Sequence, residues 1–190
     1  ESEILSADCI IKSPGIPHKV PIIQQAKAKG IEIISEIEFA SRYTNAKIIA
    51  ITGSNGKTTT TSLIYHLLEQ AGLSVGVGGN IGNSFAYMVA KEPKEYYVLE
   101  ISSFQLDGIE HFAPHIAVLL NITPDHLDRY DYKFENYINS KFRIAMNQTE
   151  NDYLIYDADD EVITQWLSTH TIKSKLIPFS IEKELPQGAF

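Results

Sequence analysis

Short apolar runs alternate with segments of helical periodicity along the chain, and this alternation restricts the fold more than any other feature. The runs are rich in β-branched and aromatic residues, as strands are. They span residues 8–13, 30–35, 46–52, 73–79, 95–102, 114–123, 151–157 and 174–180. Strands that are apolar almost throughout, with helices between them, belong to parallel sheets covered on both faces. The sequence therefore predicts an α/β fold.

Composition and charge exclude several classes of partner. The 190 residues are 44% hydrophobic and 21% charged, which is ordinary for a globular chain with a good core. A net charge of −8 without a basic cluster argues against a nucleic-acid surface. No apolar run reaches membrane-spanning length, and the single Cys9 cannot form an internal disulfide. We expect a cytoplasmic protein that binds neither nucleic acid nor membrane.

A glycine-rich loop follows the run at 46–52 and leads into a helix. The usual phosphate-binding pattern, G-x-x-x-x-G-K-[ST], would place its first glycine at position 51, but here the leading glycine is Gly53. Free N–H groups and the positive end of the helix favour an anion at this point. Lys57 adds a positive charge, and the hydroxyl of Thr58 can ligate Mg²⁺. We interpret the stretch as a shortened triphosphate loop; the alternative is a glycine-rich turn with a surface lysine.

The helix after this loop is predicted to begin near Lys57 and to stop at Gly72, a suitable C-terminal residue. Its apolar residues recur with helical spacing and are expected to form one buried face. They are Leu63, Ile64, Leu67, Leu68 and Ala71.

Polar residues follow three other apolar runs, and the carboxyl ends of parallel strands share one edge of the sheet. Glu100 closes one run and is either a metal ligand or a solvated strand end. Asn80, in "VGGNIGN", lies in a tight turn or beside a ligand. His126 follows a third run, where a lone histidine is usually structural or solvated, but the convergence favours a site. The other polar residues at this edge are Ser102, Ser103, Gln105, Asp125 and Asp128.

Several segments together resemble a known family. They are "IKSPGIP", "ITGSNGKTTTT", "VGGNIGN", "LEISSFQL", "LNITPDHLDRY" and "SKFRIAMN", in that order. They resemble the Mur ligases of bacterial cell-wall synthesis, whose shortened loop reads G-[ST]-N-G-K-[ST]-[ST]. The loop alone identifies only the ligase superfamily, whereas "SSFQL" with "DHLDRY" resembles the member that adds D-glutamate. The resemblance covers almost the whole chain.

The resemblance implies a domain organisation. Residues 47–190 would be an incomplete central ATP-binding domain with a parallel-sheet, P-loop ATPase-like fold. Residues 1–46 would be the C-terminal part of a UDP-binding Rossmann-like domain plus a linker. A D-glutamate-binding domain would lie outside these 190 residues. This polypeptide alone is therefore expected to make no product, and the enzyme is expected to be a monomer.

The reaction implied is ATP-dependent addition of D-glutamate to UDP-N-acetylmuramoyl-L-alanine in peptidoglycan synthesis. The acceptor carboxylate would be phosphorylated by ATP, and the amine of D-glutamate would then attack the acyl phosphate. Bringing two anions together requires metal ions and hydrogen-bond donors, which suits the polar edge described above. Three alternatives remain open: a sister ligase for another amino acid, a folylpolyglutamate synthase, or a nucleotide-binding module without ligase chemistry.

Residue roles are carried over by position in the matching segments. The ATP phosphates would be held by Gly53, Ser54, Asn55, Gly56, Lys57, Thr58 and Thr59. Thr58 and Glu100 would hold a first Mg²⁺, with His126 near a second. The acceptor would contact Ser13, Gly15, Asn80, Ser102, Gln105 and His126. Lys57, His126 and Lys141 would be the catalytic residues.

Lys141 occupies an unusual place in the segment 133–147. It lies near the middle of an apolar arc made by Phe134, Tyr137, Ile138, Phe142 and Ala145. Its stem could follow these neighbours while the ammonium reaches water or pairs with Asp125. Burial, however, lowers the pKa of a lysine, and a neutral amine can add CO₂ to become a carbamate. The resemblance aligns this segment with one that carries a carbamylated lysine, so we predict a carbamate at Lys141 that binds the second Mg²⁺.

Overall fold

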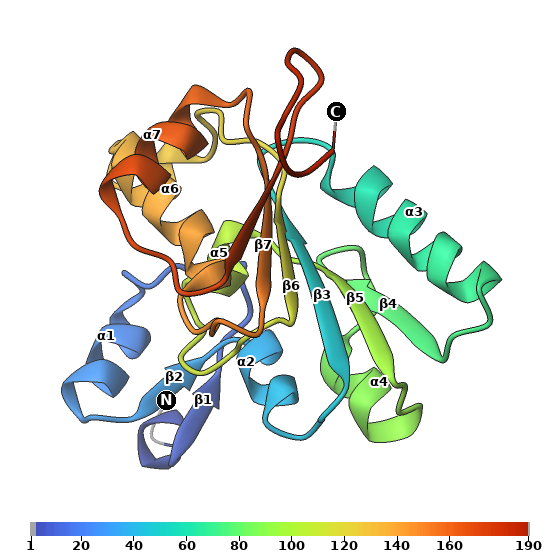
Figure 1. Cartoon of the computed structure of the whole chain (residues 1–190). Helices are drawn as coiled ribbons and strands as arrows, with labels where there is room; N and C mark the ends of the chain where they lie inside the picture. Colours follow the sequence, from blue (N-terminus) through green and yellow to red (C-terminus); the bar gives the residue numbers. More distant parts are fainter. Residues whose placement is uncertain (1–2, 190) are drawn as a thin grey trace.

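A six-stranded parallel sheet forms the centre of the computed structural model, which describes residues 3–189 (Figure 1). Its strands are β3 (Lys47–Thr52), β4 (Val75–Gly79), β5 (Tyr96–Glu100), β6 (Ile116–Leu119), β7 (Tyr153–Asp157) and β8 (Lys175–Phe179). The strand order is β4-β5-β3-β6-β7-β8, and all neighbours are parallel. Every strand lies within a predicted apolar run, and the α/β fold is confirmed.

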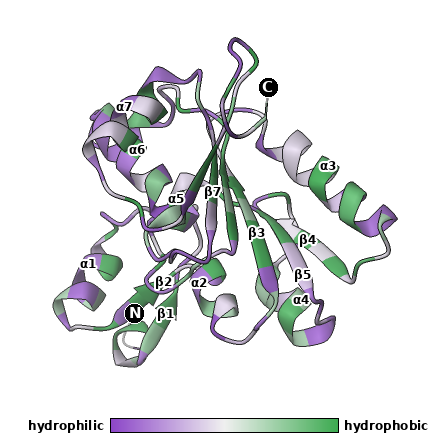
Figure 2. Cartoon of the chain, in the orientation of Figure 1, coloured by the Kyte–Doolittle hydropathy of each residue, from purple (hydrophilic) through white to green (hydrophobic). Residues whose placement is uncertain are grey.

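The helices of this unit lie on both faces of the sheet. They are α3 (Lys57–Gln70), α4 (Phe85–Lys91), α5 (Ser103–Leu106), α6 (Phe134–Phe142) and α7 (Glu161–Thr169), with 3-10 turns η2 (Leu127–Arg129) and η3 (Arg143–Ala145). Alternate residues of each strand point to opposite faces. Ile51, Val98 and Val118 face α3, whereas Ala50 and Leu99 join a larger core with the other helices. Figure 2 shows the resulting hydrophobic centre of the sheet.

Helix α3 buries less of its apolar face than the sequence predicts. Ile64 and Leu68 pack against the sheet, but Leu63 and Leu67 are 55% and 59% exposed. The reason is geometric: within the described part of the chain, the helix touches the sheet along one stripe, which is narrower than the apolar arc. The helix does end as expected, because Gly72 follows it with a φ of 79°.

The N-terminal part has its own small sheet. Its elements are η1 (Ile4–Ser6), β1 (Cys9–Ile11), α1 (Pro21–Ala28), β2 (Glu32–Ile34) and α2 (Glu36–Ser41). Strands β1 and β2 pair in parallel with each other and stand apart from the six-stranded sheet (Figure 1). Helix α2 packs against α4. None of the helices in residues 3–189 is long and apolar enough to cross a membrane.

Two carboxylates of α2 attach this part to the rest of the chain. Glu36 Oε1 accepts hydrogen bonds from Ser84 Oγ at 2.7 Å and from the backbone N–H of Ala86 at 2.6 Å. Glu38 is fully buried, and its Oε2 accepts from three successive backbone N–H groups, those of residues 110–112, at 2.8–2.9 Å. Burial acts to raise the pKa of Glu38, but these bonds and Arg42 together lower it.

Candidate functional site

The glycine loop joins β3 to α3 at the carboxyl edge of the sheet. Gly56 caps the helix with a φ of 81°, a left-handed conformation that residues with a side chain rarely adopt. The first N–H groups of a helix have no partner within it and carry partial positive charge. Residues 53–59 therefore form a loop that leads into a helix start, as the sequence predicts, and anion binding there stays a prediction.

The shortened loop is braced by the segment after β6. Asn121 Oδ1 accepts from the N–H of Asn55 at 2.8 Å, and Asn121 Nδ2 donates to the carbonyl of Asn55 at 3.1 Å. The hydroxyl of Ser54 donates to the Thr123 carbonyl and accepts from the Thr123 N–H, both at 2.9 Å. Because the Asn55 N–H is used in this way, it is directed to Asn121 and not to a ligand.

Two lysines share one carbonyl of the loop. Lys57 Nζ donates to the Gly53 carbonyl at 2.9 Å and to the Ser54 carbonyl at 3.0 Å. Lys141 Nζ donates to the same Gly53 carbonyl at 2.8 Å and lies 4.6 Å from the centre of the Tyr137 ring. Lys141 is only 2% exposed, and its hydrogen-bond partner is Gly53, not Asp125.

Burial changes the acid-base chemistry of Lys141. Removal from water, and secondarily the positive charge of Lys57, lower the pKa of Lys141 from 10.5 to about 7, while Asp125 acts weakly in the opposite direction. A large fraction of the amine is therefore neutral near pH 7. The apolar arc predicts that Lys141 lies among apolar neighbours, and the structure buries it; its modification stays a prediction.

Glu100 connects the phosphate loop to the next strand. It is 2% exposed, so it is not a solvated strand end. Its Oε2 accepts from Thr58 Oγ1 at 2.6 Å, and its Oε1 accepts from Asn80 Nδ2 at 2.7 Å. The two predicted ligands of the first Mg²⁺ thus touch each other.

A cavity of about 140 Å³ lies beside the loop. It is lined by Lys57, Asn80, Ser102, Ser103, Phe104, Asp125, His126, Tyr137 and Lys141. Five of the predicted site residues, from five separate segments, are therefore brought together. His126 has a φ of 50°, rare for a residue with a side chain, and its Nε2 lies 3.5 Å from Asp125 Oδ2.

Three predicted contact residues lie elsewhere. Gln105 Oε1 accepts from the N–H and hydroxyl of Ser102 at 2.9 and 3.0 Å, so the pair forms a capping box for α5. Gln105 Oε1 thus serves the helix end, and the substrate role of Gln105 stays a prediction. Ser13 and Gly15 lie in the turn after β1 and do not line the cavity.

Three residues at the site are not singled out by the sequence pattern: Phe104, which lines the cavity, Asn121 and Tyr137. Asn121 was read as part of an apolar run, although an amide directly after a strand is a usable signal. Tyr137 was assigned to the apolar arc of α6, yet its hydroxyl lies 3.2 Å from Ser54 Oγ. Nothing in the local pattern indicates that second role.

Of the two predicted Mg²⁺ sites, the one at Thr58 and Glu100 has suitable oxygen ligands, whereas the one at His126 and Lys141 lacks them while Lys141 is unmodified. Within residues 3–189, no three His, Cys, Asp or Glu side chains form a preformed metal site. A Mg²⁺ bound with a nucleotide needs only one or two protein oxygens, because phosphates and water complete its shell, and Thr58 with Glu100 supplies them. An ammonium has no lone pair, and the nitrogen of a neutral amine is a poor ligand for Mg²⁺, which prefers oxygen, so Lys141 suits this metal site as a carbamate.

A parallel sheet with a glycine-lysine loop between a central strand and a helix, and an acid on the adjacent strand, defines a phosphate-binding nucleotide domain of the P-loop class. The family model described as "Mur ligase middle domain" matches residues 51–187. The chain therefore belongs to the Mur ligase family.

Individual relatives agree with this assignment. The chain is 63% identical over 190 residues to UDP-N-acetylmuramoylalanine--D-glutamate ligase of Christiangramia forsetii, covering 100% of the chain and 43% of that protein. It is 60% identical over 184 residues to the enzyme of the same name from Bacteroides fragilis, covering 97% and 41%. The MurF ligase of Thermotoga maritima, solved with ADP, has a TM-score of 0.63 at 20% identity, covering 95% and 52%. The chain thus spans about two fifths of the curated relatives it matches.

Proposed function

We propose that the full-length protein is an ATP-dependent ligase that adds D-glutamate to UDP-N-acetylmuramoyl-L-alanine in bacterial peptidoglycan synthesis. The observation that carries the proposal is the cavity in which Lys57 of the glycine loop meets Asn80, Ser102, His126 and Lys141. In this cavity Lys57 can donate to a phosphate, and Asn80, Ser102 and His126 can bind an acceptor carboxylate. Transfer of a phosphoryl group from ATP to a carboxylate requires that the phosphate and the carboxylate be bound next to each other.

The chemistry follows from the groups in the cavity. An acceptor carboxylate oxygen attacks the γ-phosphorus and ADP leaves; the amine of D-glutamate then attacks the acyl phosphate, and phosphate leaves. Lys57 would turn from the loop carbonyls to the phosphoryl group and stabilise its charge as it transfers. His126, with Asn80 and Ser102, would orient the acceptor so that its carboxylate meets the phosphorus in line.

The remaining parts of the site are assigned with this reaction. Thr58 with Glu100 would hold one Mg²⁺, and His126 with a carbamate on Lys141 would hold a second; these ions would neutralise the phosphates. Residues 1–46 would belong to the UDP-binding domain, with Ser13 and Gly15 near the uridine diphosphate. Residues 47–190 would belong to the ATP-binding domain. The enzyme would act as a monomer in the cytoplasm.

D-glutamate is favoured as the second substrate by the names of the relatives that are 63% and 60% identical. The fold does not decide this point, because the similar MurF structure bears the name of a sister ligase. The test is ADP release by the full-length protein with UDP-N-acetylmuramoyl-L-alanine and a panel of amino acids. Release dependent on D-glutamate supports the proposal, and preference for another amino acid or for a folate acceptor overturns it.

The alternative from a different class is a nucleotide-binding module without ligase chemistry. It predicts nucleotide binding but no ADP release that depends on an amino acid. The same assay therefore separates the two functions, and radiolabelled D-glutamate identifies the amide product directly.

A further inference from the structure

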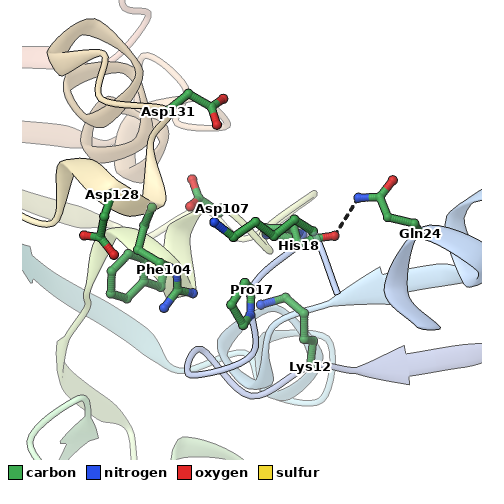
Figure 3. Close-up of a pocket in the computed structure, with 10 residues that line it drawn as sticks. Lys12, Pro17, His18, Gln24, Phe104, Asp107, Asp128 and Asp131 are labelled. Carbon is green, nitrogen blue, oxygen red and sulfur yellow. Dashed lines mark hydrogen bonds between the residues drawn. The ribbon is translucent and has the colours of Figure 1, made fainter. Parts of the chain in front are cut away.

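A second cavity, of about 220 Å³, separates the N-terminal part from the six-stranded unit. Figure 3 shows Lys12, Pro17 and His18 from the N-terminal part facing Phe104 and Asp107. Phe104 lines this cavity and also the candidate active site. Phe104 therefore lies between the two cavities.

Arg129, the last residue of η2, contacts both sides of this second cavity. Its guanidinium carbon lies 4.3 Å from the centre of the Phe104 ring, which is within cation–π distance. Its Nη2 donates to the carbonyl of Pro14 at 3.2 Å, a contact that spans 115 residues of sequence. The side chain of Arg129 thus links Phe104 to the turn after β1.

The turn that Arg129 reaches is itself held firmly. The N–H of Ile16 donates to the Ser13 carbonyl at 3.0 Å. Lys12, 4% exposed, donates from Nζ to the Ile16 carbonyl at 2.9 Å and to the Ser13 carbonyl at 3.3 Å. Because the turn is held by these hydrogen bonds, a contact that fixes the position of Pro14 also fixes the position of Gly15.

Phe104 also lies beside His126. The ring centres of Phe104 and His126 are 5.3 Å apart, and Tyr130 stacks on Phe104 at 5.9 Å with an interplanar angle of 12°. The backbone N–H of Arg129 also donates to the His126 carbonyl at 2.9 Å. This backbone bond places Arg129 one 3-10 turn after His126, so the two residues are held at a fixed separation.

Charge pairing does not explain the position of Arg129. Among residues 3–189, no carboxylate lies within 4.0 Å of its nitrogens, although Asp107 and Asp128 line the same cavity. Asp107 instead accepts from Tyr130 Oη at 3.0 Å and from Ser140 Oγ at 2.6 Å. The planar shape and reach of the guanidinium, which lysine lacks, account for both contacts.

We infer that Arg129 is a positioning residue that fixes the turn at Ser13–Gly15 relative to His126, and so sets the affinity for the UDP-sugar substrate. The inference rests on the proposed function. It implies that loss of Arg129 weakens the UDP-sugar complex and slows turnover, while the phosphate loop, which Arg129 does not contact, keeps its affinity for ATP.

The test compares Arg129→Met and Arg129→Lys in the full-length protein with the control Arg143→Met. Arg143 also donates to backbone carbonyls, those of Leu106 and Ile109 at 2.7 and 2.5 Å, but both lie in the same six-stranded unit. Direct calorimetric Kd values for the UDP-sugar and for ATP, kcat, and thermal unfolding are measured for each. Loss of a charge-assisted bond predicts about a tenfold or greater rise in the UDP-sugar Kd for both Arg129 variants, with the ATP Kd within about twofold of wild type.

The outcomes are distinct. Arg143→Met should lower the unfolding temperature without changing the ratio of the two Kd values. A UDP-sugar Kd within about twofold of wild type in Arg129→Met, or equal loss of both affinities in a folded Arg129→Lys, overturns the inference. If wild type itself shows no D-glutamate-dependent turnover, the proposed function fails first, and binding of the UDP-sugar alone still decides the role of Arg129.

Discussion

At the scale of single residues, the Gly53 carbonyl is the point on which the phosphate loop and Lys141 converge. Two ammonium groups at 2.8 and 2.9 Å from one oxygen repel each other, and this repulsion adds to burial in lowering the pKa of Lys141. The lowered pKa has a cost for stability, because protonation of the buried amine is unfavourable. Between about pH 7 and pH 10.5 the amine of Lys141 is protonated in the unfolded state but neutral in the folded state. The free energy of unfolding therefore increases as pH rises through this interval.

The first prediction concerns modification of this amine. In full-length protein with Mg²⁺, ATP and ¹³C-bicarbonate, a carbamate carbon should appear by NMR and should be lost in Lys141→Ala. The variant should lose most activity, about a hundredfold or more, and keep its affinity for ATP; acetate should restore part of the turnover by supplying oxygen ligands. Lys133→Ala, at the exposed start of the same helix, is the control. A wild-type enzyme with full activity and no labelled carbamate would refute the prediction.

The second prediction concerns the hydrogen bonds from Asn121 that hold the glycine loop at Asn55. Asn121→Ala removes both hydrogen bonds to Asn55, together worth about 2 kcal/mol, so the Kd for ATP should rise by up to about thirtyfold while the Kd for the UDP-sugar stays unchanged. Asn136→Ala is the matched control, because its amide donates to the Tyr130 carbonyl at 3.3 Å, away from the loop. Fluorescent-nucleotide titration measures the effect. Equal nucleotide affinity in wild type and Asn121→Ala would mean that the loop holds its shape unaided.

At the scale of elements, the carboxyl end of β4 approaches β5 unusually closely. Gly79 has a φ of 87°, and a Cβ there would lie 2.3 Å from the Glu100 carbonyl oxygen. The next residue, Asn80, uses both its backbone N–H and its side chain to bind Glu100. A glycine is therefore needed for Asn80 and Glu100 to meet.

The third prediction follows from this approach. Gly79→Ala should destabilise the protein by about 2 kcal/mol or more and should also reduce activity, because β4 must move away from Glu100. Gly72→Ala is the control: it has a similar φ of 79° but no atom within 4 Å of the added Cβ, so it should cost only about 1 kcal/mol. Urea denaturation and kcat separate the two. Equal effects of the two variants would show that conformational strain alone, not the contact with Glu100, matters.

Local patterns predicted the elements well and their arrangement less well. The strands, the end of α3 at Gly72 and the glycine loop could be predicted, because each depends on residues that are close together in the sequence. The S-x-x-Q pattern at Ser102 and Gln105 has a local meaning, a helix cap, which the structure shows, whereas the substrate contacts that the family resemblance implies for them stay a prediction. The exposure of Leu63 depends on what lies opposite α3, and the role of Asn121 depends on a partner 66 residues away. No periodicity encodes such contacts.

At the scale of the whole molecule, Glu38 joins the N-terminal part to the six-stranded unit. Its three backbone bonds come from residues 110–112, more than 70 positions along the chain. Arg42 donates to the same carboxylate at 3.0 Å. A buried carboxylate with this many donors is stabilising only while it is ionised.

The fourth prediction is that Glu38→Gln lowers the free energy of unfolding by about 3 kcal/mol at pH 7, because the uncharged amide has one acceptor oxygen and cannot accept from both the three N–H groups and Arg42. The pKa of Glu38 is lowered from 4.5 in the folded state, so its contribution is present above pH 4.5 and is lost as pH falls through the folded value. The difference between wild type and variant, measured by urea denaturation, should shrink in acid. Glu110→Gln, a half-exposed partner 3.9 Å from Arg42, should change stability by about 0.5 kcal/mol or less. A pH-independent difference would contradict the ionised role.

The brace on the glycine loop also dictates an order of events during synthesis. Ser54 and Asn55 are held by residues 66 to 69 positions further along, so the loop cannot take its final shape when it leaves the ribosome. Closing such a long stretch of chain carries an entropic cost that must be met before the contacts form. A nascent chain that ends before Thr123 therefore has the glycines and the lysine but no working nucleotide pocket, and ATP cannot assist the earliest stages of its folding.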